Sequence, residues 1–182
     1  DNILATMAAK LLVQNGQYFL IGGEYVGPSG TISSDDMIGE VSVQGKPPSR
    51  ETFNIIKGVF SSRNENFQAR DFEIFEDTNA ISQDDNEKST ADLQLNLVTS
   101  GAQALALAKI TLRRQRYYTK VSMTCNLKVF KYKVGDTVYI DHPQYNFGSR
   151  KFEIVDMKMN FGPDPTVEVL CQETDQSIYA DN

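Results

Sequence analysis

The chain has 182 residues, of which 40% are hydrophobic, and its 18 basic and 24 acidic side chains give a net charge of −6. A chain of this length buries about 70% of its unfolded surface, which is enough for one compact domain or two small ones that share an interface. No apolar run approaches the roughly 20 residues of a membrane-spanning helix, and the two cysteines have neither a disulfide-framework nor a metal-site spacing.

The first 45 residues predict the end of a helix, a hairpin and a turn. Residues 5–10 are typical of a helix end. Two apolar runs at 11–13 and 18–21 flank Asn15-Gly16, and both turn residues tolerate positive φ, so we expect a hairpin at 11–21. Asp35 and Asp36 precede Met37 in a turn-like setting. A carboxylate pair can do acid–base chemistry, but a turn is the favoured interpretation here.

The next stretch predicts two strands and a loop. Residues 53–60 form an apolar strand, and a bulge is expected because Ile55 and Ile56 fall on opposite faces. Residues 61–66 predict a polar turn and 67–75 a second strand. The acidic stretch 76–87 lacks apolar periodicity, so it is expected to be a surface loop, and it lacks the ligand spacing of a calcium loop.

A helix is predicted at about 100–116. Ser100 and Gln103 have capping-box spacing. One face carries apolar side chains at spacings of three and four, namely Ala104, Leu105, Ala108 and Leu112. The other face carries Lys109, Arg113 and Arg116 and is expected to be solvated.

The last third predicts antiparallel strands. Apolar residues alternate from 121 to 129, a Gly135-Asp136 turn follows, and Val138 and Ile140 share the face of another strand. Residues 152–161 and 166–172 surround Gly-Pro-Asp-Pro, the clearest hairpin signal, with a bulge or strong twist expected between Ile154 and Val155. Cys125 and Cys171 lie on apolar sides of their strands, which favours buried, reduced thiols. The alternative is a disulfide between the two strands, which requires that the strands pair.

These elements predict a mainly β (α+β) fold of twisted antiparallel sheets, or small β-barrel-like subdomains, with one prominent amphipathic helix at about 100–116. Two subdomains are expected. The first spans 1–70 and holds the hairpin at 11–21, and the second spans 71–182 and holds the helix.

Charge is unevenly distributed along the chain. Residues 1–99 hold 15 acidic and 7 basic side chains, whereas residues 109–133 hold eight basic and no acidic ones. A basic, aromatic surface can bind phosphates or stack on bases. Nucleic-acid-binding domains are usually basic overall, whereas this chain is acidic. Two alternatives are therefore favoured: a solvated helix face whose charge complements the acidic stretch upstream, or a charged interface between subunits. The candidate protein-interaction face comprises Lys109, Arg113, Arg114, Arg116, Tyr117 and Lys120.

The sequence shows no constellation for catalysis. His142 is the sole imidazole, lies beside Pro143 in an expected loop, and has no nucleophile motif nearby. We therefore expect no enzymatic activity, no cofactor and no metal site.

Several short segments, in order, resemble one family. They are residues 49–60 and 67–72, Asn15-Gly16-Gln17-Tyr18, residues 31–38, Thr99-Ser100-Gly101-Ala102-Gln103-Ala104, Val134-Gly135-Asp136-Thr137-Val138, and residues 173–179. The sequence is similar to phage tail proteins related to the tip attachment protein J of lambda-like phages. The resemblance extends over nearly the whole chain, although none of its motifs is a catalytic signature.

The resemblance implies a structural part of the central hub at the tail tip, assembled as a ring of three copies, that supports tail assembly, tube closure and host attachment. Implied partners are neighbouring distal tail proteins, the tape measure, fibres and, indirectly, a host surface receptor. Synthesis would occur in the bacterial cytoplasm, and the chain would be an internal fragment of a larger tail protein. The alternatives are a receptor- or glycan-binding adhesin and, third, a nucleic-acid-binding module that uses the basic helix.

Overall fold

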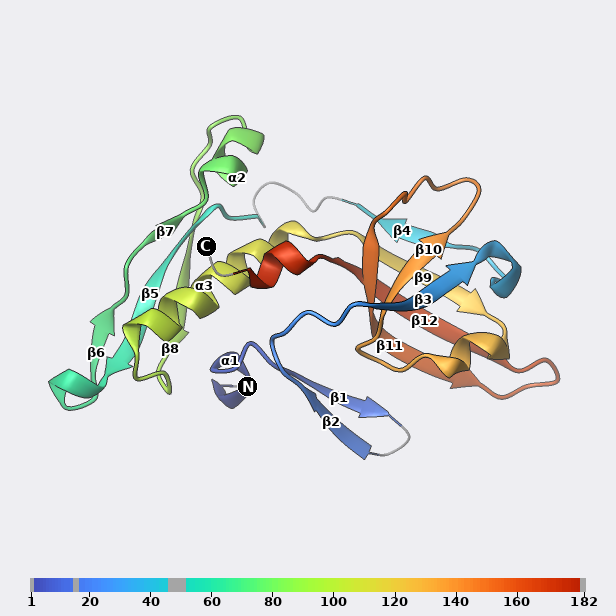
Figure 1. Ribbon diagram of the computed structural model, residues 1–182, viewed down its shortest axis with the longest axis horizontal. Coiled ribbons are helices and arrows are strands. Elements are labelled where there is room, and N and C mark those ends of the chain that lie inside the picture. Colours follow the sequence, from blue (N-terminus) through green and yellow to red (C-terminus); the bar gives the residue numbers. More distant parts are fainter. Residues whose placement is uncertain (1, 15–16, 46–51, 181–182) are drawn as a thin grey trace.

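The computed structural model describes residues 2–14, 17–45 and 52–180. The molecule is elongated, with a curled half-barrel of strands at one end, a smaller sheet at the other, and a long helix between them (Figure 1). The predicted mainly β, α+β fold with one prominent helix is confirmed.

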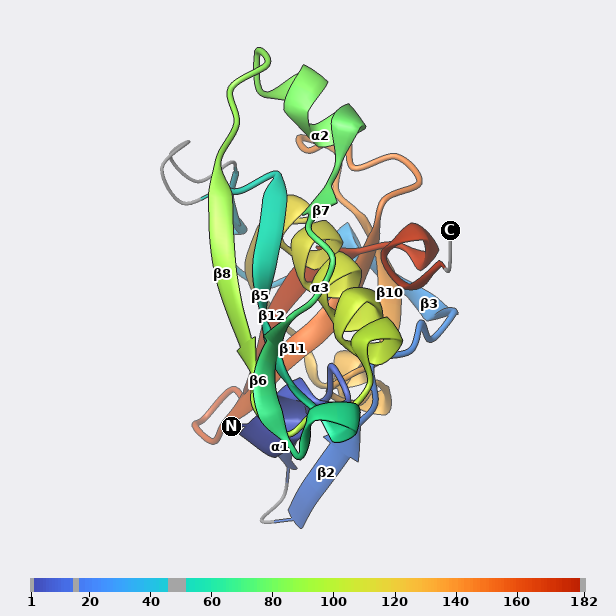
Figure 2. The same cartoon turned by 90° about the vertical axis from the view of Figure 1, so that its left-hand side faces the viewer.

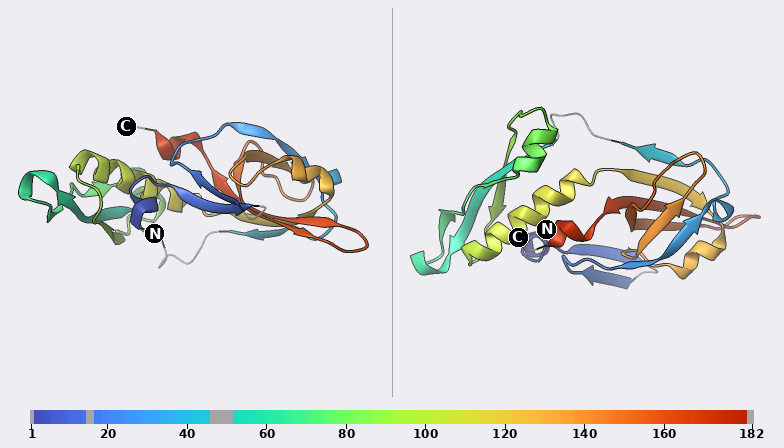
Figure 3. Two further views of the ribbon diagram at one scale, coloured as in Figure 1. Left: turned by 90° about the horizontal axis from the view of Figure 1, so that it is seen from below. Right: turned by 45° about the horizontal axis from the view of Figure 1, so that its top comes forward.

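The half-barrel is a six-stranded sheet with the order β3-β10-β11-β12-β9-β4. Its strands are β3 (Pro28–Ser33), β4 (Ser42–Gln44), β9 (Lys120–Cys125), β10 (Thr137–Asp141), β11 (Lys151–Asn160) and β12 (Thr166–Thr174). The β3–β10 pair is parallel and the other pairs are antiparallel. The inner face buries alternate residues such as Val121, Phe152 and Val169, and the views in Figure 3 show how the sheet curls around them.

Two predictions about these strands are confirmed. Val138 and Ile140 are both buried on β10. The register of the β11–β12 hairpin shifts between Ile154 and Asp156, so a bulge lies where the apolar pattern changes face.

The smaller sheet is built on β5 (Ile55–Ser62). It pairs with β6 (Gln68–Asp71), β7 (Phe75–Glu76) and β8 (Thr90–Leu95), and β8 runs parallel to it. Helix α3 (Gly101–Arg116) lies across this sheet, as Figure 2 shows from the sheet side. Ile56 and Phe60 of β5 pack with Leu107 and Leu112 of α3 in a second apolar core.

Helix α3 begins directly after Ser100, as predicted, but its N-terminus is held differently. The Ser100 side chain makes no capping hydrogen bond, and the Gln103 amide donates instead to the Thr6 carbonyl, at 3.1 Å. The buried positions are Ala104, Leu107, Ala108 and Leu112, with Leu105 half-buried. The expectation of a solvated opposite face was wrong, because Lys109, Arg113 and Arg116 are half-buried among neighbouring segments.

Short helices replace two expected segments. The strand predicted at 121–129 ends at Cys125, and residues 127–131 form the 3-10 helix η4 (Leu127–Lys131) because the Asn126 side chain accepts the Lys128 N–H. The acidic stretch contains α2 (Thr78–Gln83), capped by Asp77, which accepts the N–H groups of Asn79 and Ala80. Further short helices are η1 (Ser34–Asp36), η3 (Arg63–Glu65) and η5 (Gln176–Tyr179).

Three smaller differences concern strand and helix boundaries. Along β8 the register of β5 runs without a shift, whereas on its other edge the register changes by one residue between the pairs with β7 and the pairs with β6. The irregularity expected at 53–60 therefore lies in the partner segment between β6 and β7 rather than in β5 itself. The strand expected at 67–75 is interrupted into β6 and β7. The first helix, α1 (Asn2–Ala5), ends at the first residue of the expected 5–10 segment.

The N-terminal hairpin is formed by β1 (Lys10–Gln14) and β2 (Gln17–Ile21), as predicted, while its turn at 15–16 lies outside the described residues. The division into 1–70 and 71–182 stays a prediction. Hydrogen-bonded strands cross that boundary, because β5 pairs with β7 and β8, and β3 and β4 join the sheet of β9–β12.

Candidate functional site

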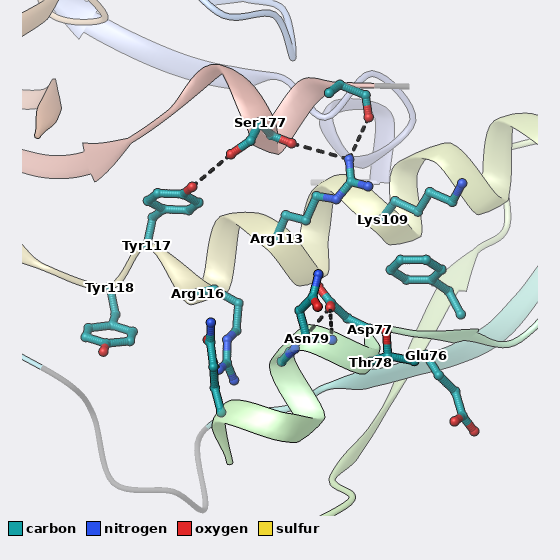
Figure 4. Close-up of a pocket in the computed structure, with 14 residues that line it drawn as sticks. Glu76, Asp77, Thr78, Asn79, Lys109, Arg113, Arg116, Tyr117, Tyr118 and Ser177 are labelled. Atoms are coloured by element: carbon teal, nitrogen blue, oxygen red, sulfur yellow. Dashed lines mark hydrogen bonds between the residues drawn. The ribbon is translucent and has the colours of Figure 1, made fainter. Parts of the chain in front are cut away.

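A groove of about 640 Å³ lies between α2, α3 and η5, and we call it the α3 groove (Figure 4). One wall comes from the end of β7 and from α2, the floor from the C-terminal half of α3, and the far wall from η5. Its lining residues are Phe75, Glu76, Asp77, Thr78, Asn79, Ala80, Gln83, Lys109, Arg113, Arg116, Tyr117, Tyr118, Ser177 and Ala180.

The η5 wall is fixed by Asp175. Its carboxylate accepts the Ser177 N–H at 3.0 Å and the Lys151 ammonium at 3.0 Å. Burial raises the pKa of Asp175, but the hydrogen bonds from Ser177 and Lys151 outweigh that effect, so its pKa lies below the ordinary value. The carboxylate therefore stays ionised at neutral pH and holds the end of β12 and the start of η5 together.

Arg113 spans the groove from α3 to η5. Its Nη1 donates to the main-chain carbonyls of Ser177, at 3.3 Å, and Ala180, at 2.6 Å. Beside it, the Tyr117 hydroxyl shares a 2.8 Å hydrogen bond with the Ser177 hydroxyl. These acceptors are neutral, so they orient the guanidinium without cancelling its charge.

Arg116 is engaged within the chain. Its two terminal nitrogens lie 2.6 and 3.2 Å from the carboxylate oxygens of Asp84, and one also donates to the Gln83 side chain. The Arg116 and Asp84 side chains are only 16% and 14% exposed. Asp84 also accepts from the Asn54 amide, at 3.1 Å. At this position, the basic helix α3 therefore forms an ion pair with the acidic stretch at 76–87.

The other predicted residues divide between the groove and its surroundings. Lys109 lines the groove, with its ammonium 5.5 Å from the centre of the Phe75 ring. Arg114 lies outside it, donating to the Tyr179 hydroxyl at 2.8 Å and to the Ala8 carbonyl. Lys120 is exposed at the start of β9.

The structure therefore brings four of the six predicted residues to the groove: Lys109, Arg113, Arg116 and Tyr117. The α2 and η5 walls were not predicted. The Asp77 cap was a local signal for α2, but no local signal places η5 against α3. The role of these residues as a protein-interaction face stays a prediction.

A second surface is the apolar arm, the hairpin of β1 and β2 at residues 10–14 and 17–21. No third strand pairs with it in the described part of the chain. An ion pair at 2.8 Å between Lys10 and Glu153 joins its base to β11. Yet Leu11, Tyr18, Phe19 and Leu20 are all substantially exposed, Tyr18 at 74%. Three consecutive exposed large side chains place apolar groups on both faces of the hairpin.

Outside the groove, the histidine and the two cysteines, whose side chains could be reactive, make structural contacts. His142 accepts the Gln144 N–H through Nδ1 and packs against the Tyr145 ring. Cys125 and Cys171 are buried free thiols, as predicted. Burial, helped by the Asp36 charge, raises the pKa of Cys125 to about 11, and burial with the Cys125 charge raises that of Cys171 to about 12. Neither thiol is a nucleophile at neutral pH.

Among the residues that the structure describes, no group of three or more His, Cys, Asp or Glu side chains could hold a metal ion. In the same ranges, no helix has the length and apolar character needed to cross a membrane.

The fold is that of tail proteins of phage-like particles. The chain is similar to a protein of the virion of a native gene transfer agent particle, with TM-score 0.72, 16% identity, and coverage of 98% of this chain and 39% of that one. It is also similar to a tail protein from Neisseria meningitidis MC58, with TM-score 0.67, 12% identity, and coverage of 97% and 54%. The 43 kDa tail protein of prophage MuSo2 from Shewanella oneidensis has TM-score 0.60, 8% identity, and coverage of 94% and 52%.

The sequence identifies the family directly. Residues 3–156 match the family model described as "Putative phage tail protein", and the chain belongs to that family. It spans about half or less of the length of the structural relatives above. A search of curated protein sequences gave no match. The protein is a structural component of a phage-type tail, in agreement with the resemblance drawn from its motifs.

Proposed function

We propose that the chain is a structural part of the central hub at the tip of a phage tail. Three copies form a ring around the tail axis, close the tube and support the proteins that attach to the host. The protein is made in the bacterial cytoplasm and enters the virion at the tail tip. Membership of the phage tail family and the fold shared with virion and prophage tail proteins support this proposal.

The observation that carries the proposal is the apolar arm. A lone two-stranded hairpin is marginally stable in water, and its exposed apolar groups favour burial against another surface. Leu11, Tyr18, Phe19 and Leu20 leave on the order of 400 Å² of apolar side-chain surface exposed, if a large side chain is taken as about 200 Å². That is about half of what one partner contributes to a standard protein interface. Such an arm suits a subunit that is completed by assembly.

The α3 groove supplies a second contact in this proposal, for an acidic segment of a neighbouring tail protein. Arg113 is held in the groove by neutral carbonyls, which leave its positive charge in place. Phosphate binding is less well supported, because Arg114 does not line the groove and the charge of Arg116 is already paired with Asp84. We therefore do not propose a nucleic-acid-binding function.

Electron microscopy of particles labelled with antibody against this chain tests the proposal. Label confined to the distal tail end is the expected result, with particles of a deletion strain as the control. Label along the tube, or no label on intact and partly disassembled particles when the antigen is expressed, would remove the hub assignment.

A further inference from the structure

Helix α3 carries a second apolar stripe, which lines a smaller hollow beside the α3 groove. This hollow has a volume of about 200 Å³, and we call it the side hollow. Its apolar lining residues are Ala102, Leu105, Ala106, Ile110 and Tyr179. The four α3 positions recur at spacings of three and four, so they share one face of the helix. That face differs from the one that packs on the smaller sheet, which carries Ala104, Leu107, Ala108 and Leu112.

The side hollow and the α3 groove adjoin each other at Arg113. The residues that line both spaces are Lys109, Arg113 and Ala180. Arg113 reaches from α3 to η5, where its Nη1 donates to the Ala180 carbonyl, so its side chain borders both spaces (Figure 4). An apolar space and a polar space therefore meet at a cation.

Arg113 is the group that can bind an anion here. In the described part of the chain, its hydrogen bonds are those from Nη1 to two neutral carbonyls, which leaves the edge formed by Nε and Nη2 available to a carboxylate. The two acidic side chains of the opposite wall are engaged, since Asp77 caps α2 and Glu76 forms an ion pair with Lys88 at 2.9 Å. A carboxylate that enters the groove would therefore bind at Arg113.

We infer that the partner segment at α3 combines an acidic side chain, which binds Arg113, with an apolar side chain, which fills the side hollow. This inference rests on the proposed function, which places an acidic segment of a neighbouring tail protein in the groove. Charge complementarity selects the acidic group, and the lining of the side hollow selects the apolar one. Residues 102 and 113 are about 16 Å apart along the axis of α3, a length that about five residues of extended chain cover. The two side chains of the partner therefore lie within about five residues of each other.

Photo-crosslinking in assembled tails identifies the occupant of the side hollow. The whole tail protein carries p-benzoylphenylalanine in place of Ala102, which is exposed and lines the hollow, or in place of the exposed Ala69 of β6 as the control. The expected product from residue 102 joins another tail protein at a segment that has an apolar residue and an Asp or Glu within about five residues. The same product from residue 69, a product within this polypeptide or between its copies, a segment without such a pair, or no product would overturn the inference.

A charge exchange tests the acidic half of the contact. Arg113→Glu should lower the yield of intact tails about tenfold, and replacement of the crosslinked segment's acidic residue by Arg should restore that yield in the Arg113→Glu background. A chance acidic neighbour would give no rescue. Failure of the exchange to restore the yield would overturn the inference.

The variant Ala102→Asp tests the apolar half. A carboxylate in the first turn suits the dipole of α3, so the urea midpoint should not fall. Tail yield should fall at least tenfold, because the new charge makes the side hollow polar and repels an acidic segment. Ala69→Asp is the matched control, with normal yield expected, and normal yield with Ala102→Asp would overturn the inference. The antibody label judges the hub proposal separately, because it can stay at the tail tip when these tests fail.

Discussion

Neighbouring basic residues of α3 serve different purposes that their order in the sequence does not reveal. Arg114 ties the N-terminal segment and η5 to the helix, Arg116 pairs with Asp84, and Arg113 faces the groove. The sequence identified the cluster of positive charge correctly. It could not separate these roles, because the partner of each guanidinium lies more than 30 residues away.

The Arg116–Asp84 pair should contribute to stability. Arg116→Gln leaves the Asp84 carboxylate without its cation in a setting where that side chain is 14% exposed, so we expect a loss of about 1–3 kcal/mol in the free energy of unfolding. Urea denaturation measures it. Arg113→Gln is the control, with an expected loss under about 1 kcal/mol because only hydrogen bonds to carbonyls are removed. Equal losses of unfolding free energy in the two variants would contradict the stabilising role of the Arg116–Asp84 ion pair.

Arg113 should instead matter for assembly. Arg113→Glu reverses the charge in the groove, and we expect tail yield to fall about tenfold while the urea midpoint of the chain changes little. Reversal of Arg113 and Arg116 together would confuse the two effects, since the Asp84 pair would be lost as well. Lys158→Glu, at an exposed position of β11, is the charge-matched control. Normal yield with Arg113→Glu would exclude an acidic partner at the groove.

The buried thiols predict a pH dependence in alkali. The folded-state pKa values of Cys125 and Cys171, about 11 and about 12, exceed the ordinary value of 9.0. Their contribution to stability is therefore fully present below pH 9 and is lost as pH rises toward 11 and 12, by about 1.4 kcal/mol per pH unit for each thiol. Unfolding free energies measured at pH 8 and pH 10.5 should fall less in Cys125→Ala/Cys171→Ala than in the wild type. An identical decrease in the unfolding free energy of the variant and the wild type would contradict a contribution from the buried thiols.

At the level of elements, periodicity predicted those that have a regular apolar face. The helix at 101–116 and the hairpins of β1–β2 and β11–β12 are of this kind. Periodicity failed where one capping side chain decided the backbone, at Asn126 before η4 and Asp77 before α2. It also could not predict the parallel pairs β3–β10 and β5–β8, because their partners are far apart in sequence.

The parallel β5–β8 pair depends on Gly58. A Cβ atom at this position would collide with the main chain of Leu93 on β8. Gly58→Ala must displace one strand from the other, so we expect a loss of about 2–4 kcal/mol in the free energy of unfolding. Urea denaturation against Gly162→Ala, where a Cβ meets open space, checks this. A Gly58→Ala variant as stable as the control would mean that the two strands are not packed so closely.

At the level of the whole molecule, the candidate surfaces arise from segments that only the fold brings together. The α3 groove joins α2, α3 and η5. The basic floor of the groove and the hairpin of the arm could both be predicted from the sequence. The exposure of the arm could not be predicted, because a continuous apolar run in a strand indicates burial without saying which part of the assembly provides it.

The hub proposal accounts for the exposed apolar arm, because a neighbouring subunit would cover the arm in the assembled tip. The most direct measurement is a cryo-electron microscopy reconstruction of the intact tail tip. We predict three copies of the chain around the tail axis, with the β1–β2 hairpin of each buried against its neighbour. A map that places the chain elsewhere in the particle, or that shows the hairpin exposed to solvent in the assembled tip, would contradict the proposal.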